Sequence, residues 1–346
     1  MNVDRSTFSE TLKSLKPALS SGGAIPELKH FWFDGKYLYA YDGGLGIRLP
    51  FEGDIKGGVL GSTLLSLVNS STLKEIFLDV VKGELVVQMG RSKTSIPIMA
   101  ESSNPWGFTD QKAGSFSFNL SKEFIEGLKI VSVLEAEQPK RSEHYGVVLF
   151  PSRDFIGLYS TDSKALASVE VDGKFAPELH KMILPHKFVA QLISLGKEGH
   201  EVVFTEDMIV ANLGDIQVCS TLLDNENVVE LPNVLDTHAS DTDNFVDIPE
   251  LLGEALSRAN ILAGPKENYV KLSVNKKELS VTGKLAQGSL NEKLVLAKEG
   301  GTEQIALGLK QLTKLSRCST SFAIGKTALI LTGKSSEIYI LGAYEE

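Results

Sequence analysis

Two hydrophobic patterns alternate along the chain, one typical of helices and the other typical of strands. In six stretches the apolar residues recur three and four positions apart, as they do on one face of a helix. These stretches lie at residues 8–19, 63–68, 124–134, 188–195, 251–262 and 309–315. Their starts are spaced by roughly 55 to 65 residues, which indicates an internal repeat of six units in three pairs.

Short runs of β-type residues with alternating polarity lie between the predicted helices and are bounded by turn residues. They lie at residues 31–41, 76–81, 85–89, 146–150, 155–160, 202–204, 270–274, 279–282 and 329–332. Each repeat unit is therefore predicted to hold one helix and a few antiparallel strands, which makes the chain α+β.

Two segments have the composition of linkers. Residues 100–114 hold Ser-Ser-Asn-Pro and two glycines, and residues 233–244 are polar and rich in aspartate. Such compositions do not bury easily. A chain of 346 residues is also too long for one ordinary core and fits two or three domains. We therefore predict three domains, at residues 1–110, 111–240 and 241–346.

The overall composition is that of a soluble globular protein. Hydrophobic residues make up 42% of the chain and charged residues 23%, which excludes a disordered or fibrous class. No stretch approaches the roughly 18 to 20 apolar residues of a membrane span, and residues 1–16 are too polar for a signal peptide. We expect a cytoplasmic protein with no membrane partner.

The motifs of common enzyme and cofactor sites are missing. Two Gly-Lys-Ser/Thr segments, at 325–327 and 333–335, lack the earlier glycine that a phosphate-binding loop needs. The six histidines include no pair at the i, i+4 spacing of two metal ligands on a helix. Cys219 and Cys318 stand far apart with no second thiol nearby, so we expect both to be reduced and buried. We expect no catalytic residue, cofactor or metal.

The formal net charge of −9 argues against a surface that is positive all over, so local groups of cations decide whether nucleic acid is a partner. The clearest group is Lys310, Lys314 and Arg317, which share one helical face at i, i+4 and i+7. Leucines at 309, 312 and 315 occupy another face. From the pattern alone, a solvated basic face is the simpler interpretation.

The segments 146–150 and 158–167 carry the first resemblance to a known family. The second of them has the sequence Leu-Tyr-Ser-Thr-Asp-Ser-Lys-Ala-Leu-Ala. It resembles a strand in the middle domain of the bacterial DNA polymerase sliding clamps, which ends in Thr-Asp-Gly-His-Arg-Leu-Ala. Thr161, Asp162, Leu166 and Ala167 match that motif, whereas residues 163–165, Ser-Lys-Ala, depart from its Gly-His-Arg centre.

Further segments resemble the same family and follow its order. Residues 90–95 with Pro105 resemble the close of the first domain, and 183–187, Ile-Leu-Pro-His-Lys, resemble a strand that enters a helix of the second. Residues 255–262 resemble the Ala-x-x-Arg-Ala-x-Ile-Leu helix of the third domain, and 339–344 stand where the family ends. The whole chain thus resembles a divergent bacterial-type sliding clamp, the family of the DNA polymerase III beta subunit. A cellular and a viral source both stay open.

The resemblance implies three similar clamp domains, each a duplicated unit of helix and antiparallel sheet. It implies that two subunits close head to tail into a ring, with helices lining the pore. Such a homodimer encircles double-stranded DNA without sequence preference and holds a DNA polymerase on it without catalysing any reaction. A clamp loader is a further expected partner. The alternative is a structural or assembly protein, unrelated to DNA, built on the same duplicated units.

The resemblance places the helix at 309–315 on the pore, so Lys310, Lys314 and Arg317 become the first candidates for contacts to DNA phosphates. Cations on other predicted helices are further candidates: Lys187, Lys13, Lys16, Lys122, Lys129 and Arg258. Arg258 stands four residues after Glu254, so an ion pair on the helix surface is the alternative for it.

The second site that the resemblance implies is an apolar pocket between the second and third domains, which takes short motifs of polymerases and other replication proteins. The matching positions are Thr161, Ser163, Leu166, Pro232, Ile340, Gly342, Ala343 and Tyr344. Core packing is the alternative for Leu166 and Ile340. Because residues 163–165 and the tail depart from the family, we expect a partner motif different from the usual bacterial one.

The resemblance also pairs the first domain of one subunit with the third domain of the other across the ring interface. The candidate contacts are Leu64, Leu65 and Leu67 on one side and Ile261 and Leu262 on the other. Core packing is the alternative for these five residues.

Overall fold

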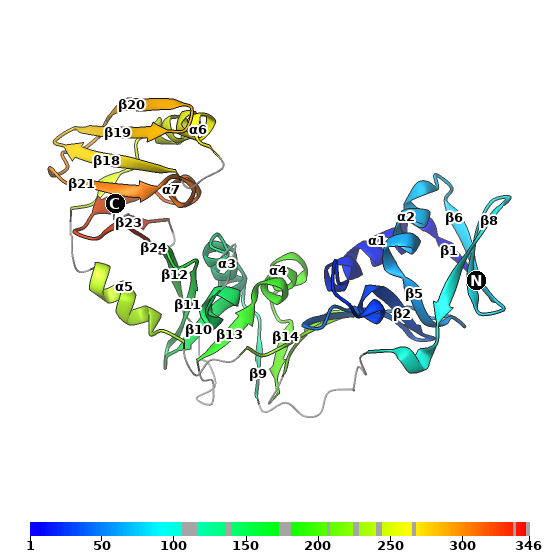
Figure 1. Ribbon diagram of the computed structural model, residues 1–346. Helices are drawn as coiled ribbons and strands as arrows, with labels where there is room; N and C mark the ends of the chain where they lie inside the picture. The colour runs from blue at the N-terminus through cyan, green and yellow to red at the C-terminus, as the bar shows by residue number, and fades with distance from the viewer. Residues whose placement is uncertain are drawn as a thin grey trace. The chain divides into compact units, whose positions relative to one another are not determined.

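The computed structural model describes residues 1–105, 116–135, 140–172, 181–205, 208–223, 228–239, 244–264, 268–334 and 337–343. These residues form α-helices and antiparallel β-sheets, so the predicted α+β class is confirmed (Figure 1). They group into two compact units. Unit 1 holds Met1–Lys122 and Ala190–Leu222, and unit 2 holds Glu123–Val189 and Leu223–Glu346.

Unit 1 contains one antiparallel sheet in the order β1-β6-β7-β8-β5-β2-β3-β4-β16-β15-β14-β9. Its strands are β1 Asn2–Asp4, β2 His30–Asp34, β3 Tyr37–Tyr41, β4 Leu45–Pro50, β5 Lys56–Leu60, β6 Glu75–Val81, β7 Glu84–Met89, β8 Ser92–Met99, β9 Phe116–Asn119, β14 Glu201–Phe204, β15 Met208–Leu213 and β16 Ile216–Thr221. Distant parts of the chain meet where β4 pairs with β16, with Ile47 opposite Val218. Both side chains are fully buried, so apolar burial stabilises this junction together with the backbone hydrogen bonds.

Two helices of unit 1, α1 (Arg5–Leu15) and α2 (Gly61–Ser70), pack against each other. α1 begins after Asp4, whose carboxylate accepts the backbone N–H of Thr7 at 2.9 Å and satisfies a free donor of the first turn. Its apolar face is buried. The helix ends at Leu15 and continues as a 3-10 turn, η1 (Lys16–Ala18), because Pro17 has no N–H to extend an α-helix.

Unit 2 contains two antiparallel sheets, in the orders β13-β10-β11-β12-β24-β23-β22-β17 and β20-β19-β18-β21. Their strands are β10 Gly146–Pro151, β11 Phe155–Thr161, β12 Ala165–Asp172, β13 Met182–Pro185, β17 Val246–Asp247, β18 Tyr269–Asn275, β19 Glu278–Leu285, β20 Gly288–Val295, β21 Gln304–Gly308, β22 Ser321–Ile324, β23 Ala328–Thr332 and β24 Ile338–Gly342. The larger sheet is continuous because β12 pairs with β24, with Leu166 opposite Ile340.

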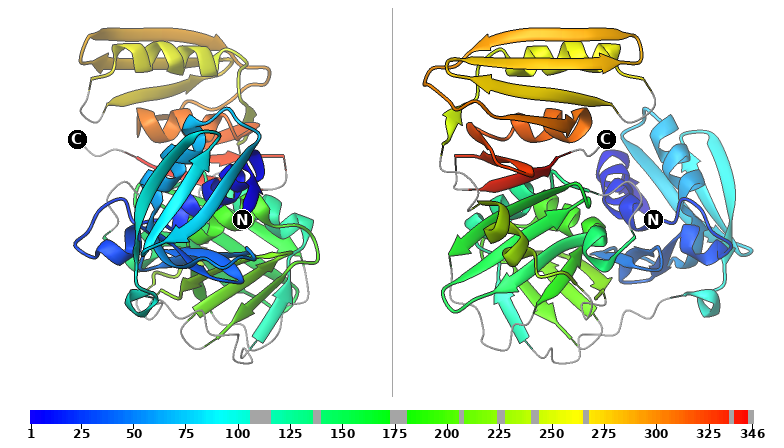
Figure 2. Two further views of the ribbon diagram at one scale, coloured as in Figure 1. Left: turned by 90° about the vertical axis from the view of Figure 1, so that its right-hand side faces the viewer. Right: turned by 60° about the vertical axis from the view of Figure 1, so that its left-hand side comes forward.

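Three helices of unit 2 pack on these sheets. α6 (Leu252–Leu262) contacts β19, β20 and the next helix, α7 (Leu309–Ser316), as Figure 2 shows. α5 (Leu231–Ala239) lies against β23. Two more helices, α3 (Lys122–Val131) and α4 (His186–Leu195), include residues of both units. The remaining 3-10 turns are η2 (Pro26–Lys29), η3 (Glu101–Ser103) and η4 (Ser142–Tyr145).

The predicted helices and strands are largely confirmed. Each of the six predicted helical stretches overlaps a helix: α1, α2, α3, α4, α6 and α7. The predicted run 31–41 is two strands, because the Asp34 carboxylate accepts the backbone N–H groups of Lys36 and Tyr37 and Gly35 turns with a φ of +94°. The chain therefore reverses inside a run that alternation alone joins.

The predicted linker at 233–244 is wrong for its first half, which belongs to helix α5. Leu231, Val234 and Leu235 stand at i, i+3 and i+4 and pack on an apolar cluster, and this contact outweighs the polar composition. The linker at 100–114 carries η3, and its residues 106–114 lie outside the described residues. The domain boundaries at 110 and 240 also lie outside them, so the three-domain division stays a prediction.

Candidate functional site

Helix α7 has one buried apolar face and one exposed basic face. Leucines at 309, 312 and 315 are at most 2% exposed. Lys310, Lys314 and Arg317 lie on the exposed side. The i, i+4, i+7 spacing thus separates cations from leucines as predicted. Lys314, in the last turn, also interacts favourably with the negative end of the helix dipole.

The other candidate cations are all exposed: Lys13, Lys16, Lys122, Lys187, Lys129 and Arg258. Carboxylates engage the last two of them. Lys129 pairs with Glu126 at 2.6 Å. Arg258 donates from Nε to Glu292 at 2.7 Å and lies 3.4 Å from Glu254, and the bond from Arg258 lowers the pKa of Glu292. The ion pair between Arg258 and Glu254 is therefore present, and a DNA contact of Arg258 stays a prediction.

An apolar cluster in unit 2, here called the partner cluster, contains two of the predicted pocket residues. Its buried members are Val148, Tyr159, Leu166, Ile183, Val228, Leu231, Ala328 and Ile340, and its half-buried members are Phe150, Leu223, Val229, Val234, Leu235 and Ile338. Leu166 and Ile340 are each 4% exposed, which favours their core role. The half-buried members are the accessible part of the cluster.

The remaining predicted pocket residues lie around the partner cluster or outside the described chain. Pro232 stands in the first turn of α5 and is half-buried. Gly342 and Ala343 follow Ile340 at the end of β24 and are half-buried. Thr161 is buried and Ser163 is exposed. Tyr344 lies outside the described residues.

The turn between β11 and β12, residues 161–165, is held by its own side chains. The Thr161 hydroxyl donates to the carbonyl of Ala165 at 2.7 Å. One oxygen of Asp162 accepts the backbone N–H groups of Lys164 and Ala165 at 3.0 and 2.8 Å. Ser163 has a φ of +75°, in the left-handed region that favours glycine. The family's glycine position thus keeps a glycine-like backbone although the residue is serine.

Charged groups stand at the margin of the partner cluster. Lys181 donates to the carbonyl of Val228 at 3.2 Å and to Glu230 at 2.9 Å, and its Nζ lies 5.8 Å from the ring centroid of Phe150. Burial raises the pKa of Tyr159 to about 12, and nearby carboxylates add to the rise. Its phenol is therefore neutral in the ordinary pH range and is an apolar surface with one polar tip.

The candidate interface residues differ in exposure. Leu64 is fully buried in α2, which favours core packing for it. Leu65 and Leu67 are half-buried along the same helix, and a surface hollow of about 490 Å³ is lined by Ser62, Thr63, Ser66 and Leu67. Ile261 is 72% exposed at the end of α6, and Leu262 is half-buried.

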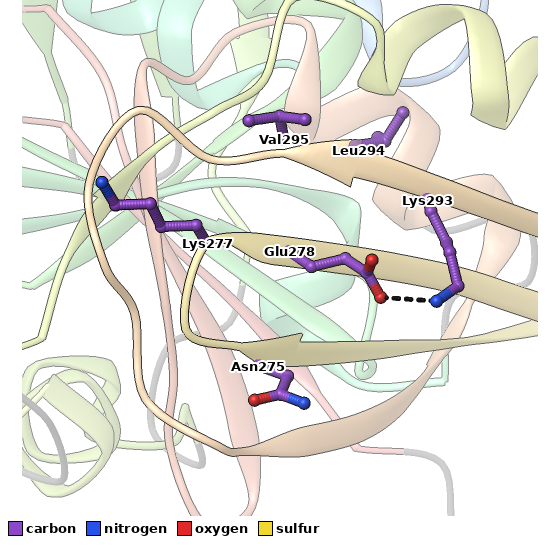
Figure 3. A pocket seen from close by; sticks show the side chains of 6 residues that line it. All are labelled: Asn275, Lys277, Glu278, Lys293, Leu294 and Val295. Carbon is purple, nitrogen blue, oxygen red and sulfur yellow. Dashed lines mark ion pairs between the residues drawn. The ribbon is translucent and has the colours of Figure 1, made fainter.

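A second hollow, of about 320 Å³, lies at one end of the four-stranded sheet (Figure 3). It is lined by Asn275, Lys277, Glu278, Lys293, Leu294 and Val295. Lys293 pairs with Glu278 at 2.9 Å and lowers the pKa of that carboxyl. Val295, at the end of the edge strand β20, is 81% exposed.

Comparison with known proteins decides the fold. No family model matches the sequence. The curated "Beta sliding clamp" of Salmonella typhimurium is 23% identical over 234 residues, which span 66% of this chain and 62% of that protein. The solved sliding clamp of Bartonella birtlesii, bound to griselimycin, has a TM-score of 0.89 at 18% identity and covers 100% of this chain and 99% of its own. The DNA polymerase III beta subunit of Thermotoga maritima has a TM-score of 0.85 at 16% identity, with the same coverage.

The chain has the sliding-clamp fold. The resemblance that the sequence motifs indicate is thus confirmed across the whole chain, at low identity. Within this fold, the DNA, partner and interface residues named above remain predictions, since the comparisons do not test single positions.

Sequence reasoning misses several residues of the partner cluster in this sliding-clamp fold. Tyr159 and Phe150 stand on β11 and β10, and their rings meet edge to face at 5.3 Å between centroids. Val234 and Leu235 of α5 complete one side. The available signal is the helical spacing of the apolar residues of α5, which the polar composition masks.

The described part of the chain shows no group of three or more metal-ligating side chains placed to hold a metal ion. None of its helices is long and apolar enough to cross a membrane. Cys219 is buried, and burial raises the pKa of its thiol to about 12. Cys318 is exposed, so the expectation of two buried cysteines is wrong for it, because it follows the end of α7 on the solvent side.

Proposed function

We propose that this protein is a DNA sliding clamp, a cytoplasmic homodimer that closes around double-stranded DNA and catalyses no reaction of its own. In this proposal it binds DNA without sequence preference, holds a DNA polymerase through the partner cluster, and is placed on DNA by a clamp loader. The sliding-clamp fold along the whole chain supports the proposal. The observation that carries it is the exposed basic face of α7 on an otherwise acidic chain.

A sliding protein needs attraction to phosphates without contacts that read bases. Phosphate contacts fix no sequence and weaken as salt rises, so they allow movement along the duplex. Lys310, Lys314 and Arg317 have the long, exposed side chains that such contacts need. Because the net charge is −9, the chain as a whole does not attract DNA, and attraction has to come from a local basic face.

The proposed ring has three domains in each subunit, at residues 1–110, 111–240 and 241–346, and a head-to-tail interface. On one side, Leu65 and Leu67 of α2 offer accessible apolar contacts. On the other side, Ile261 and Val295 are largely exposed, and β20 is the outer strand of its sheet. Unpaired strand edges and exposed apolar side chains are stabilised by pairing with another surface, which favours a subunit contact there.

The partner cluster is proposed to take an extended apolar segment of a polymerase or another replication protein. Its accessible members, among them Phe150, Val234 and Leu235, supply apolar contact area. Lys181 and Glu230 at its margin supply one charge of each sign. Ser163, Lys164 and Ala165 replace the family's central residues, so the preferred motif is expected to differ from the usual bacterial one.

A salt titration of DNA retention tests the proposal. Replacement of Lys310, Lys314 and Arg317 by alanine is expected to lower the salt dependence of retention by about one power of the salt concentration for each cation that contacts a phosphate. The matched control replaces Lys36, Lys56 and Lys284, three exposed lysines outside α7, and is expected to behave as the wild type. Equal retention of both variants across the titration would contradict the assignment of α7 as the helix that contacts DNA phosphates.

A further inference from the structure

Helix α7 is tied to the margin of the partner cluster by one hydrogen bond between side chains. The amide Nε2 of Gln311 donates to Oδ2 of Asp162 at 3.1 Å. Gln311 stands in the first turn of α7, next to Lys310 and one turn before Lys314. Asp162 stands in the turn between β11 and β12. The bond therefore joins the basic helix to a turn that borders the partner cluster.

The carboxylate of Asp162 accepts hydrogen bonds from Gln311 and from the backbone of its own turn at the same time. Its Oδ1 accepts the backbone N–H groups of Lys164 and Ala165, while its Oδ2 accepts from Gln311. A rotation of this carboxylate that breaks the bond to Gln311 also disturbs the two bonds that shape the turn. A change in the position of Gln311 therefore alters the hydrogen bonds that hold the backbone at 163–165.

The turn at 161–165 also fixes the end of the strand pair β12–β24, which carries Leu166 and Ile340. The carbonyl of Lys164 accepts the backbone N–H of Gly342 at 2.9 Å, and Ala165 lies opposite Leu341. One residue further, Leu166 lies opposite Ile340 inside the partner cluster. α7 also packs against β24. A chain of direct contacts therefore runs from α7 to the partner cluster within unit 2.

We propose that Gln311 is a positioning residue that couples the two sites, so that DNA on the basic face of α7 orders the margin of the partner cluster. The coupling rests on the proposed function, because it requires that α7 contacts DNA. It is reciprocal, since a partner that orders the turn favours DNA binding by the same factor. The bond is well suited to this role because Ser163 keeps the turn in a left-handed conformation that depends on its surroundings.

Hydrogen exchange of the backbone amides at 163–165 tests the positioning without any ligand. Gln311→Glu places two carboxylates face to face and is expected to speed exchange in the turn by about 3- to 10-fold, the effect of losing one hydrogen bond. Adding Asp162→Asn restores a bond with donor and acceptor exchanged. The new amide still offers an oxygen to the backbone, so exchange is expected to return to the wild-type rate.

The matched control for that measurement is Gln304→Glu, which makes the same change at an exposed position of β21, the strand before α7. It is expected to leave exchange at 163–165 unaltered. Exchange in Gln311→Glu that equals the wild type, or that the second substitution fails to restore, would overturn the positioning role.

The coupling is tested by repeating the exchange measurement on protein that a bacterial clamp loader and ATP have placed on nicked circular plasmid DNA. Wild-type protein is expected to exchange about 2-fold or more slowly in the turn when DNA is bound, because binding reduces local opening. Gln311→Ala removes the bond without adding charge, so it is expected to be retained on DNA while its turn stays insensitive to DNA. A wild-type turn that ignores bound DNA would overturn the coupling.

The same experiment separates this proposal from the proposed function. If wild-type protein is not retained on the plasmid, the clamp function fails and the coupling fails with it. The exchange rates without DNA still decide whether Gln311 positions the turn. If retention is normal and the turn does not respond, the clamp function stands and only the coupling is lost.

Discussion

Leu166 and Ile340 lie directly opposite each other across the antiparallel pair β12–β24, and each side chain is only 4% exposed. The two strands belong to distant parts of the chain and make the larger sheet of unit 2 continuous. This contact is therefore part of the core, and both side chains belong to the partner cluster. Partner binding and folding stability are expected to depend on the same pair.

Leu166→Ala is expected to lower the free energy of unfolding by about 2–4 kcal/mol, because it leaves a cavity in a buried apolar cluster. Ile340→Ala is expected to do the same. Since the two residues are in contact, the loss of unfolding free energy in the double variant is expected to differ from the sum of the two single losses by more than about 0.5 kcal/mol. Urea denaturation measures these free energies. The control combines Leu166→Ala with Leu256→Ala, because Leu256 lies in α6 outside the cluster. The losses of unfolding free energy of these two substitutions should add. Additive effects for both pairs would contradict the shared role.

Ser163 adopts a left-handed backbone at an energetic cost, and its substitutions are expected to reveal that cost. Ser163→Gly removes about 1–2 kcal/mol of steric strain and adds about 0.5–1 kcal/mol of chain entropy, so its free energy of unfolding should equal or exceed that of the wild type. Ser163→Val should be less stable than Ser163→Gly by more than about 1 kcal/mol, because a branched Cβ is disfavoured there. Thermal unfolding measures the order of the three proteins. A valine variant as stable as the glycine variant would show that the turn is not strained.

Ile261→Glu is expected to weaken the proposed dimer while leaving each subunit folded. The side chain is 72% exposed, so a carboxylate costs little in the isolated subunit but must be desolvated in an apolar interface. Light scattering should show a shift toward monomer mass at equal protein concentration. Leu251→Glu, 54% exposed at the other end of the α6 region, is the control and should keep the mass of the wild type. A dimer that survives Ile261→Glu would remove this residue from the interface.

Asp4 is expected to make the stability of α1 depend on pH in the acid range. Hydrogen bonds from Ser6 and Thr7 lower the pKa of its carboxyl from 3.8 to about 2. A pKa that is lower in the folded state means that the contribution is complete above 3.8 and is lost as the pH falls toward 2. Asp4→Asn should therefore reduce the difference in melting temperature between pH 5 and pH 2 (roughly the span of this titration). An unchanged difference would mean that the cap is not formed in solution.

The features that the sequence predicts correctly are those set by the spacing of apolar and charged residues within a single helix or strand. The leucines and cations of α7 separate on a helix at any location, so the face formed by Lys310 and Lys314 follows from sequence. The helical spacing of α5 is also present, but its polar residues suggest a linker because the surface it covers is made by other strands. Local composition contains no information on that surface.

Long-range pairing accounts for the other differences. Tyr159 joins the partner cluster through neighbouring strands and α5, none of which its own segment specifies. The family motif contains an arginine and so indicates a DNA contact for Arg258, but Glu292 on β20 engages this side chain more closely than Glu254 does. Which carboxylate a cation meets is decided by the sheet that packs against its helix.

Release of the protein from DNA on linearisation tests the central claim most directly. Protein is loaded on a nicked circular plasmid with a bacterial clamp loader and ATP and is separated from free protein by gel filtration at a salt concentration that removes simple electrostatic binding. The plasmid is then treated with an enzyme that cuts it once. A closed ring is expected to stay with the circular DNA and to leave it after the cut, because it slides off the ends. Protein that never accompanies the circular plasmid, or that remains equally bound to the linear form, would contradict the sliding-clamp function.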